Sequence, residues 1–371
     1  MASNGVHKPN VLVLGGVGFI GRNLVHYLVS NELVAKIRVV DKVPPAMGFL
    51  NARHSEAFSK VQFKHANLIN PTSVAKAFHT DDGTIFDYVF NCAAETKLAQ
   101  TEAVYRDGIF KLSCNCASEA EKHGAQRFIE LSTAQMYSTD KTPINESVSC
   151  EPWTLQGRFK LAVEQELANN FNNLDYIILR PALVYGSGDR IGLVPRLVIG
   201  GIYKVLGEKM KVLWTRDLKM NTVHVEDVAH ALWHLCQNGR RGEIYHLADS
   251  GDTTQGKFGD LVSEIFGINI DYVGSVVSSF ANLSLHDVVD DVNEKHMVPW
   301  GEACNIDDIQ STPLSPYIEE EVLRNKQLFV DGSKIQQTGF TYRHPKLTKE
   351  LLQSVIHEYI ELKLFPRSLY R

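Results

Sequence analysis

The feature that most constrains this chain is an apolar run that leads directly into a cluster of glycines. Residues 11–14 read VLVL and residues 15–21 read GGVGFIG, so that Gly15, Gly18 and Gly21 recur at every third position. This spacing permits a tight turn, a close approach of the backbone to a pyrophosphate, and close packing of a helix on a strand. The pattern predicts a strand, a turn and a helix whose N-terminus binds a dinucleotide. An ordinary glycine-rich strand-to-helix turn is the structural alternative.

An acidic residue at the end of the next apolar run favours the dinucleotide. The run 37–41 reads IRVVD, and Asp41 lies 20 residues after Gly21. At this distance a carboxylate can accept hydrogen bonds from the ribose hydroxyls of the cofactor. The same carboxylate repels a 2′-phosphate, which predicts NAD(H) rather than NADP(H), while the adjacent Lys42 acts in the opposite sense.

Apolar runs alternate with helical patterns over the first half of the chain. We predict strands at 11–14, 37–41, 61–65, 86–91, 127–133 and 176–181, and long helices at 101–123 and 155–171. Strands that alternate with helices are typical of an α/β fold with a doubly wound, mostly parallel sheet. We therefore expect a Rossmann domain over residues 1–185, with the cofactor at the carboxyl ends of its strands.

The second half of the chain is less regular and is expected to form a smaller C-terminal substrate-binding lobe over residues 186–371. Within it, residues 221–250 are expected to return to the Rossmann sheet, through strands at 221–225 and 244–247 and a helix at 228–237. The stretch 275–314 has little clear periodicity and receives no assignment.

The composition is that of a soluble globular protein and excludes two classes of partner. The chain has 371 residues, 44% of them hydrophobic, and a formal net charge of −5, which supplies no basic field for nucleic acid or for an anionic membrane surface. No apolar run approaches the ~18 residues of a membrane span, and the first ten residues lack the apolar core of a signal peptide. Six cysteines without a C-x-x-C pair indicate reduced thiols. We expect a cytoplasmic protein.

Six motifs together resemble those of the extended short-chain dehydrogenases/reductases, the family of nucleotide-sugar epimerases and dehydratases and of 3β-hydroxysteroid dehydrogenases. They are GGVGFIG at 15–21, Asp41, NCAA at 91–94, LSTAQMY at 131–137, LRPALVYGSGD at 179–189 and NTVHVEDVAHA at 221–231. The resemblance implies that NAD lies across the strand ends and that a small-molecule substrate lies between the lobes. The cofactor-binding residues that it implies are Gly15, Gly18, Phe19, Ile20, Gly21, Asp41, Lys42, Asn67, Leu68, Cys92, Ala93, Ala94, Lys160, Pro181 and Val184.

The chain departs from the family pattern where the family carries out proton transfer. The family uses a Tyr-x-x-x-Lys pair on one helical face, in which the lysine lowers the pKa of the tyrosine. Lys160 matches this lysine, but Gln156 stands at the tyrosine position, and an amide cannot serve as an acid or base near neutral pH. Gly108 stands where the family has an asparagine, and Asn67 stands where it has an acidic residue beside the adenine.

Other side chains near the predicted site have two interpretations each. Thr133 matches the catalytic Ser/Thr of the family, and either hydrogen-bonds a substrate carbonyl or satisfies a turn at the strand end. Tyr137 either packs beside the substrate or replaces the lost phenol. Residues 95–97 either face the site or form an exposed loop. The catalytic candidates are therefore Thr133, Lys160, Gln156 and Tyr137, although Lys160 can hold the nicotinamide ribose without a tyrosine.

No metal site is predicted. His230 and His234 lie four residues apart on a predicted helix, but the glutamate of an H-E-x-x-H pattern is missing and no third ligand follows.

Three functions remain open at the level of the sequence. The first is an atypical NAD(H)-dependent enzyme that acts on a nucleotide sugar or similar small molecule with another proton donor. The second is a catalytically silent NAD(H)-binding regulatory protein, and the third is a 3β-hydroxysteroid dehydrogenase-like oxidoreductase. The resemblance also implies a homodimer, formed by the helices at 101–123 and 155–171.

Overall fold

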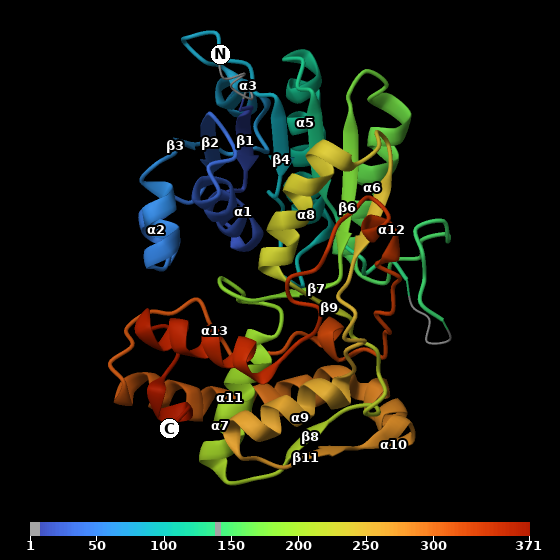
Figure 1. Ribbon diagram of the computed structural model, residues 1–371. Helices are drawn as coiled ribbons and strands as arrows, with labels where there is room; N and C mark the ends of the chain where they lie inside the picture. The colour runs from blue at the N-terminus through green and yellow to red at the C-terminus, as the bar shows by residue number, and fades with distance from the viewer. Residues whose placement is uncertain (1–7, 138–141) are drawn as a thin grey trace.

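A seven-stranded parallel sheet organises the upper part of the molecule in Figure 1. The computed structural model describes residues 8–137 and 142–371, so residues 1–7 of the N-terminal segment considered above lie outside it. The strands lie in the order β10-β6-β5-β4-β1-β2-β3. They are β1 (Asn10–Leu14), β2 (Lys36–Asp41), β3 (Gln62–His65), β4 (Tyr88–Asn91), β5 (Arg127–Leu131), β6 (Tyr176–Pro181) and β10 (Ile244–Leu247). The strand order reverses between β1 and β4, and open α/β sheets bind ligands at such a point. The predicted α/β fold with a doubly wound parallel sheet is confirmed.

Successive side chains of each strand pack against helices on opposite faces of the sheet. Val11 and Val13 belong to the core beneath α1 (Phe19–Ser30) and α8 (Val225–Asn238). Leu12 and Leu14 belong to the core beneath α3 (Pro71–Phe78), α5 (Leu112–Lys122) and α6 (Leu155–Asn170). All four side chains are fully buried. A strand buried on both faces needs a continuous apolar run, which explains VLVL.

The predicted helix at 101–123 is not continuous. It consists of α4 (Glu102–Tyr105), a π-helical turn at Arg106–Lys111, and α5. The wider turn brings Gly108 against the chain that leaves β4, where the N–H of Glu95 donates to the Gly108 carbonyl at 2.9 Å. Single π-helical turns inside helices are frequent at functional sites.

The smaller lobe is mainly helical and includes the stretch without an assignment. Its main elements are α7 (Val194–Leu206), α9 (Gln255–Phe266), α11 (Leu285–Ile306), α13 (Lys349–Glu361) and a two-stranded sheet of β8 (Met210–Val212) and β11 (Ile270–Tyr272). Residues 275–314 form most of α10 (Gly274–Ala281) and all of α11. Trp300 and Ala303 of α11 are buried in the core of the lobe. Among the described residues, no helix is both long and apolar enough to span a membrane.

The chain returns to the main sheet one strand later than predicted. β9 (Thr222–His224) pairs with β7 (Leu183–Tyr185) in a separate two-stranded sheet, so the expectation that 221–225 joins the main sheet is wrong. The main sheet is instead extended by β10, which pairs with β6. A late segment of the chain also packs against the sheet domain. It contains the short helix α12 (Ser333–Gln336), and its residues Ile335 and Phe340 are buried in the core beneath α1 and α8.

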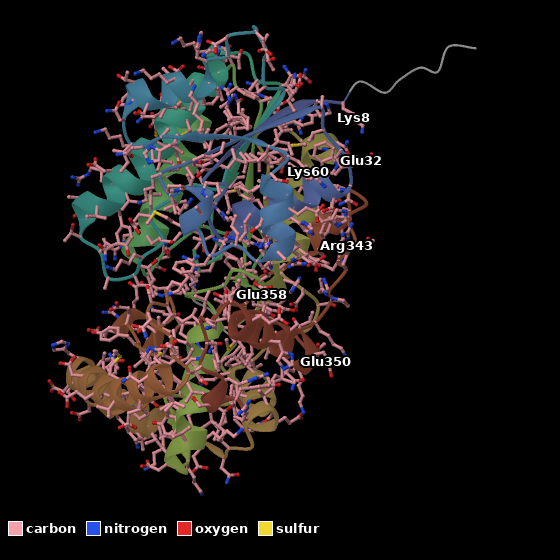
Figure 2. The ribbon with its side chains drawn as sticks, turned by 90° about the vertical axis from the view of Figure 1, so that its left-hand side faces the viewer. Lys8, Glu32, Lys60, Arg343, Glu350 and Glu358 are labelled. Carbon is pink, nitrogen blue, oxygen red and sulfur yellow. The ribbon has the colours of Figure 1, made fainter. Side chains whose placement is uncertain are left out.

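Hydrogen bonds tie the lobe to the sheet domain beside α1. The side chain of Asn23 in α1 donates to the carbonyl of Ser187 at 2.8 Å, and the Ser187 hydroxyl donates to Glu358 of α13 at 2.7 Å. Glu358 is labelled in Figure 2, where it lies between the two parts of the molecule. The lobe is therefore anchored next to the turn that opens α1.

Replacing Gly21 by alanine is expected to destabilise the fold by about 1–3 kcal/mol, because the added Cβ would lie 2.3 Å from the Gly15 carbonyl oxygen. The matched control is Gly301→Ala in α11, where a Cβ would meet no atom within 4 Å. Helix propensity alone predicts a stabilisation of about 0.5–1 kcal/mol for the control. Chemical denaturation measures both free energies of unfolding, and equal effects of the two substitutions would contradict the close packing of α1 on the turn.

Candidate functional site

The turn between β1 and α1 is shaped by contacts that leave no room for a side chain at its first glycine. Gly15 has a φ of +72°, and a Cβ there would lie 2.6 Å from the Cα of Ala93 at the end of β4. The buried guanidinium of Arg22 donates to the Val17 carbonyl at 2.6 Å and holds the middle of the turn. Sequence reasoning missed Arg22, because its partners are backbone carbonyls.

The start of α1 is open to a ligand. Gly18 is the N-cap, it is exposed, and no side chain within the described ranges caps the helix there. The N–H groups of the first turn can therefore bind an anion, with the half-buried Phe19 and Ile20 beside it. This arrangement fits the pyrophosphate of a dinucleotide.

Asp41 is fixed at the carboxyl end of β2, next to the glycine turn. Its two carboxylate oxygens accept hydrogen bonds from the N–H groups of Val17 and Val43, both at 3.0 Å. A carboxylate oxygen has two acceptor positions, so each oxygen retains one for a ribose hydroxyl. Lys42 is exposed beside it. Asp41 thus holds the glycine turn in place and is also the residue predicted to bind the ribose.

The residues predicted beside the adenine differ in exposure. Asn67 is exposed, and its side-chain carbonyl accepts a hydrogen bond from the N–H of Ile69 at 3.1 Å. Leu68 is buried in the core of the sheet domain. The Asn67 amide is therefore accessible from solvent, whereas the Leu68 side chain packs in the core.

The chain that leaves β4 forms a second wall of the site. Cys92, Ala93 and Ala94 are half-buried, and the Cys92 N–H donates to the Leu14 carbonyl at 2.9 Å. Burial raises the pKa of the Cys92 thiol to about 12, so it stays protonated and unreactive at neutral pH. The small side chains of this wall allow a flat ligand to approach the backbone.

Gln156 and Gly108, the two positions at which the sequence predicts departures in the proton-transfer residues of the family, both contact Glu95. The Gln156 side-chain amide donates to the backbone carbonyl of Glu95 at 3.2 Å. A Cβ on Gly108 would lie 2.8 Å from the Cβ of Glu95, so this position has no room for a larger residue. The Glu95 side chain accepts from the N–H of Lys97 at 2.9 Å. Glu95, Gly108 and Gln156 form one packed unit, which we call the Glu95 unit.

Lys160 interacts with a buried carboxylate that sequence reasoning missed. Its ammonium group donates to the Leu131 carbonyl at 2.5 Å and lies 3.4 Å from Glu130 Oε1. Glu130 is fully buried and also accepts hydrogen bonds from the side chains of Asn91 and Ser113. Burial raises the pKa of Glu130, while the Lys160 charge and these hydrogen bonds oppose the shift. The ammonium is therefore held at the end of β5 by two partners.

Thr133, Pro181 and Val184 lie near the ends of β5 and β6. Thr133 is half-buried, and its hydroxyl oxygen accepts from the N–H of Gln135 at 3.1 Å, as the turn interpretation expects. Its hydroxyl hydrogen remains available to a ligand. The Pro181 carbonyl accepts from the N–H of Ala134, and the half-buried Val184 lies in β7.

Tyr137 is part of a buried network behind the strand ends. Only 3% of it is exposed, and its hydroxyl accepts a hydrogen bond from Arg180. Arg180 also pairs with the buried Glu164, which accepts a hydrogen bond from Ser132. Burial raises the pKa of the Tyr137 phenol. The geometry favours the packing role of Tyr137 over the role of a substitute acid.

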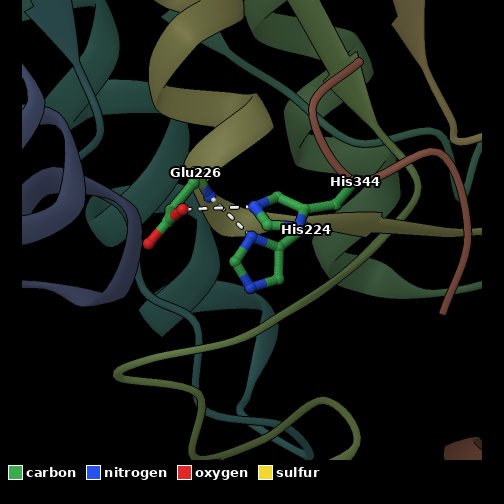
Figure 3. A group of neighbouring side chains, drawn as sticks. All are labelled: His224, Glu226 and His344. Carbon is green, nitrogen blue, oxygen red and sulfur yellow. Dashed lines mark hydrogen bonds and ion pairs between the residues drawn. The ribbon is translucent and has the colours of Figure 1, made fainter. Parts of the chain in front are cut away.

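Three side chains that the sequence analysis did not connect meet at the N-terminus of α8. Figure 3 shows His224, Glu226 and His344, with His344 Nε2 3.2 Å from Glu226 Oε2. The second oxygen of Glu226 accepts from Arg53 of α2 (Ala52–Phe58) at 2.9 Å. Burial lowers the pKa of His224 to about 4, so its ring is neutral at pH 7. Burial alone would raise the pKa of Glu226, but the hydrogen bond from Arg53 and the neighbouring histidines lower it to about 2.

The histidine pair on α8 that was considered and set aside as a metal site has packing partners instead. His230 and His234 both contact the ring of Phe340, and His234 Nε2 lies 2.8 Å from the Thr338 hydroxyl.

The chain is similar to nucleotide-sugar and sterol enzymes among known proteins. It is 24% identical over 259 residues to a probable dTDP-glucose 4,6-dehydratase of Sinorhizobium fredii, covering 64% of this chain and 70% of the relative. It is 22% identical over 273 residues to a sterol-4-alpha-carboxylate 3-dehydrogenase (decarboxylating) of Dictyostelium discoideum, covering 67% of this chain and 74% of the relative. Among solved structures, the NAD complex of the Bacillus anthracis dTDP-glucose 4,6-dehydratase matches with a TM-score of 0.70 at 18% identity, over 98% of this chain and 100% of the other.

The family model described as the NAD dependent epimerase/dehydratase family matches residues 11–248. This match spans the glycine turn, Asp41, the end of β4, Lys160 and the start of α8. It confirms the predicted resemblance and, at the level of the family, the predicted cofactor NAD. The chain belongs to the NAD-dependent epimerase/dehydratase family.

Proposed function

We propose that this protein binds NAD(H) across the strand ends and binds or slowly converts a nucleotide sugar or similar small molecule without a tyrosine general acid. The observation that carries the proposal is the Glu95 unit, in which the amide of Gln156 takes the place of a phenol and is engaged by a backbone carbonyl. An amide neither gives nor takes a proton near neutral pH. If turnover is lost completely, the protein is a catalytically silent NAD(H)-binding regulatory protein.

The cofactor half of the proposal is supported by groups that do not depend on Gln156. The open first turn of α1 offers N–H donors to the pyrophosphate, and Asp41 offers acceptors to a ribose. Lys160 has three donors, two of which are used by Leu131 and Glu130, so one remains for the nicotinamide ribose. When bound, NAD supplies a hydride acceptor.

Few side chains near the strand ends are candidates for transferring a proton to or from a substrate. The Thr133 hydroxyl can orient a substrate carbonyl or hydroxyl, but it is too weak an acid to protonate one at neutral pH. Tyr137 is engaged by Arg180 inside the protein. Removing a general acid typically costs about 10²–10⁴-fold in rate. We therefore expect turnover that is slow or absent.

The ligand class is inferred from the relatives. dTDP-glucose 4,6-dehydratases and a UDP-glucose 4-epimerase are among them, which favours a nucleotide sugar. A second candidate is an apolar alcohol, favoured by the similarity to sterol-4-alpha-carboxylate 3-dehydrogenase. Mass spectrometry of molecules that copurify with the protein distinguishes the two, since a sugar nucleotide and a sterol differ in mass and fragmentation.

The wild-type protein is expected to bind NADH more tightly than NADPH, because the Asp41 carboxylate repels a 2′-phosphate. Asp41→Asn keeps an acceptor for the Val17 N–H but removes the charge, and should reduce the preference by about tenfold, or roughly 1.4 kcal/mol. Lys42→Ala is the matched control and should increase the preference. Titration of reduced-cofactor fluorescence measures both affinities, and equal or tighter NADPH binding by the wild type would overturn the assignment.

Gln156→Tyr is expected to raise the rate of NAD-linked oxidation of a fitting alcohol. A general acid-base group contributes about 10²–10⁴-fold in rate, and this is the upper limit of the expected increase. Because Lys160 is shared with Glu130 and Leu131, its effect on the new phenol is reduced, and we expect the lower end of this range. NADH formation is followed by absorbance with sugar nucleotides and sterols as substrates.

Gln156→Phe is the control for this experiment, since it adds the same ring without a hydroxyl. A rate increase equal to that of Gln156→Tyr would show that the phenol is not responsible. Rapid turnover by the wild type that is lost in Tyr137→Phe would contradict the proposal, because Tyr137 would then be the acid.

We also propose that the protein is a homodimer that pairs α4–α5 and α6 of two copies. The proposal rests on the resemblance to the family, and these helices lie side by side on one face of the sheet (Figure 1). Light scattering at micromolar concentration should give twice the 41.6 kDa mass of the chain. A monomeric mass would refute the dimer and leave the cofactor site unaffected.

A further inference from the structure

The group His224, Glu226 and His344 is assembled by a long-range contact of the backbone. His224 ends β9 and is the N-cap of α8, and Glu226 lies in the first turn of that helix. His344 comes from the segment between α12 and α13. The N–H groups of Arg343 and His344 donate to the two carboxylate oxygens of Asp227, at 2.7 and 2.9 Å. Asp227 thus fixes the late segment over the start of α8.

The three side chains place their donor atoms close together. One ligand atom from each residue lies within 4.8 Å of the other two, and the two imidazole centroids are 4.0 Å apart. In a tetrahedral zinc site with bonds of about 2.0–2.1 Å, ligand atoms are about 3.4 Å apart. The 3.2 Å separation of His344 Nε2 and Glu226 Oε2 already matches this distance. His224 Nδ1 accepts a hydrogen bond from the N–H of Glu226 at 3.3 Å, so an ion bound through this nitrogen replaces that hydrogen bond.

Glu226 keeps one oxygen for the histidines, and two of the three side chains are partly exposed. Arg53 occupies Oε1 of Glu226, so Oε2 is the oxygen that remains for the histidines. Glu226 and His344 are partly exposed, with 34% and 24% of their side chains accessible, which allows water to reach a fourth coordination position. His224 is buried and stacks edge-on against Tyr185, which limits its motion.

We propose that His224, Glu226 and His344 bind a divalent transition-metal ion of the Zn²⁺ class, with water as the fourth ligand. Two imidazoles and one carboxylate are a donor set that zinc accepts, and the ion replaces the proton that His344 shares with Glu226. The ion ties the segment around residue 344 to α8 and, through Arg53, to α2. The site is independent of the proposed NAD function.

The test uses the full-length protein after treatment with a chelator. Zn²⁺ is titrated in competition with a chromophoric chelator, and Co²⁺ binding is followed by visible absorption. The wild type should bind one equivalent, give the Co²⁺ bands of a tetrahedral site, and melt at a higher temperature with Zn²⁺. His344→Ala should weaken Zn²⁺ binding at least about tenfold, since even outer partners of metal ligands contribute 10–100-fold.

Two further variants make the result specific. Glu226→Gln keeps the shape of the side chain and should also weaken binding, which covers the case in which His344→Ala fails to fold. His286→Ala is the matched control, because His286 is an exposed histidine that lies 3.5 Å from the carboxylate of Asp290. It should leave Zn²⁺ binding unchanged. A wild type without a stoichiometric site, or a site that persists in both His344→Ala and Glu226→Gln, would overturn the proposal.

Discussion

The close approach of the β1–α1 turn to the end of β4 is the contact on which the rest of the site depends. Gly15 lies so near the backbone of Ala93 that even a methyl group would not fit. The approach aligns the open N-terminus of α1, the Asp41 carboxylate and the small residues after β4 along one edge of the sheet. Hydrogen bonds between the lobe and α1 then fix the second part of the molecule beside the same edge.

The part of the site at which the sequence predicts a departure from the family is also held by mutual packing. The Glu95 side chain lies where a side chain on residue 108 would otherwise be, because Gly108 has none. The backbone carbonyl of Glu95 accepts a hydrogen bond from the Gln156 side chain. The carboxylate of the buried Glu130 lies 3.4 Å from the Lys160 ammonium, so part of the lysine charge is already paired inside the protein.

The features that could be predicted from the sequence are those set by local pattern. The VLVL run predicts β1 because both faces of that strand are buried, and the spacing from Gly21 to Asp41 predicts the end of β2. The π-helical turn at 106–111 could not be predicted, because it depends on the contact between Gly108 and Glu95. α11 was missed because it is long but presents only a few buried side chains between charged ones, and it contains Pro299. The burial of Tyr137 and the approach of His344 to Glu226 depend on partners 43 and 118 residues away.

A crystal structure of the protein with NAD bound would test the central claim most directly, that the cofactor edge is intact and the tyrosine acid is gone. We predict the pyrophosphate over the first turn of α1, the Gln156 amide still on the Glu95 carbonyl, and Lys160 shared between Leu131, Glu130 and the nicotinamide ribose. No tyrosine hydroxyl should then lie within hydrogen-bond reach, about 3.2 Å, of a substrate oxygen beside the nicotinamide. A pyrophosphate bound elsewhere, or Tyr137 released from Arg180 and turned toward the nicotinamide, would contradict the claim.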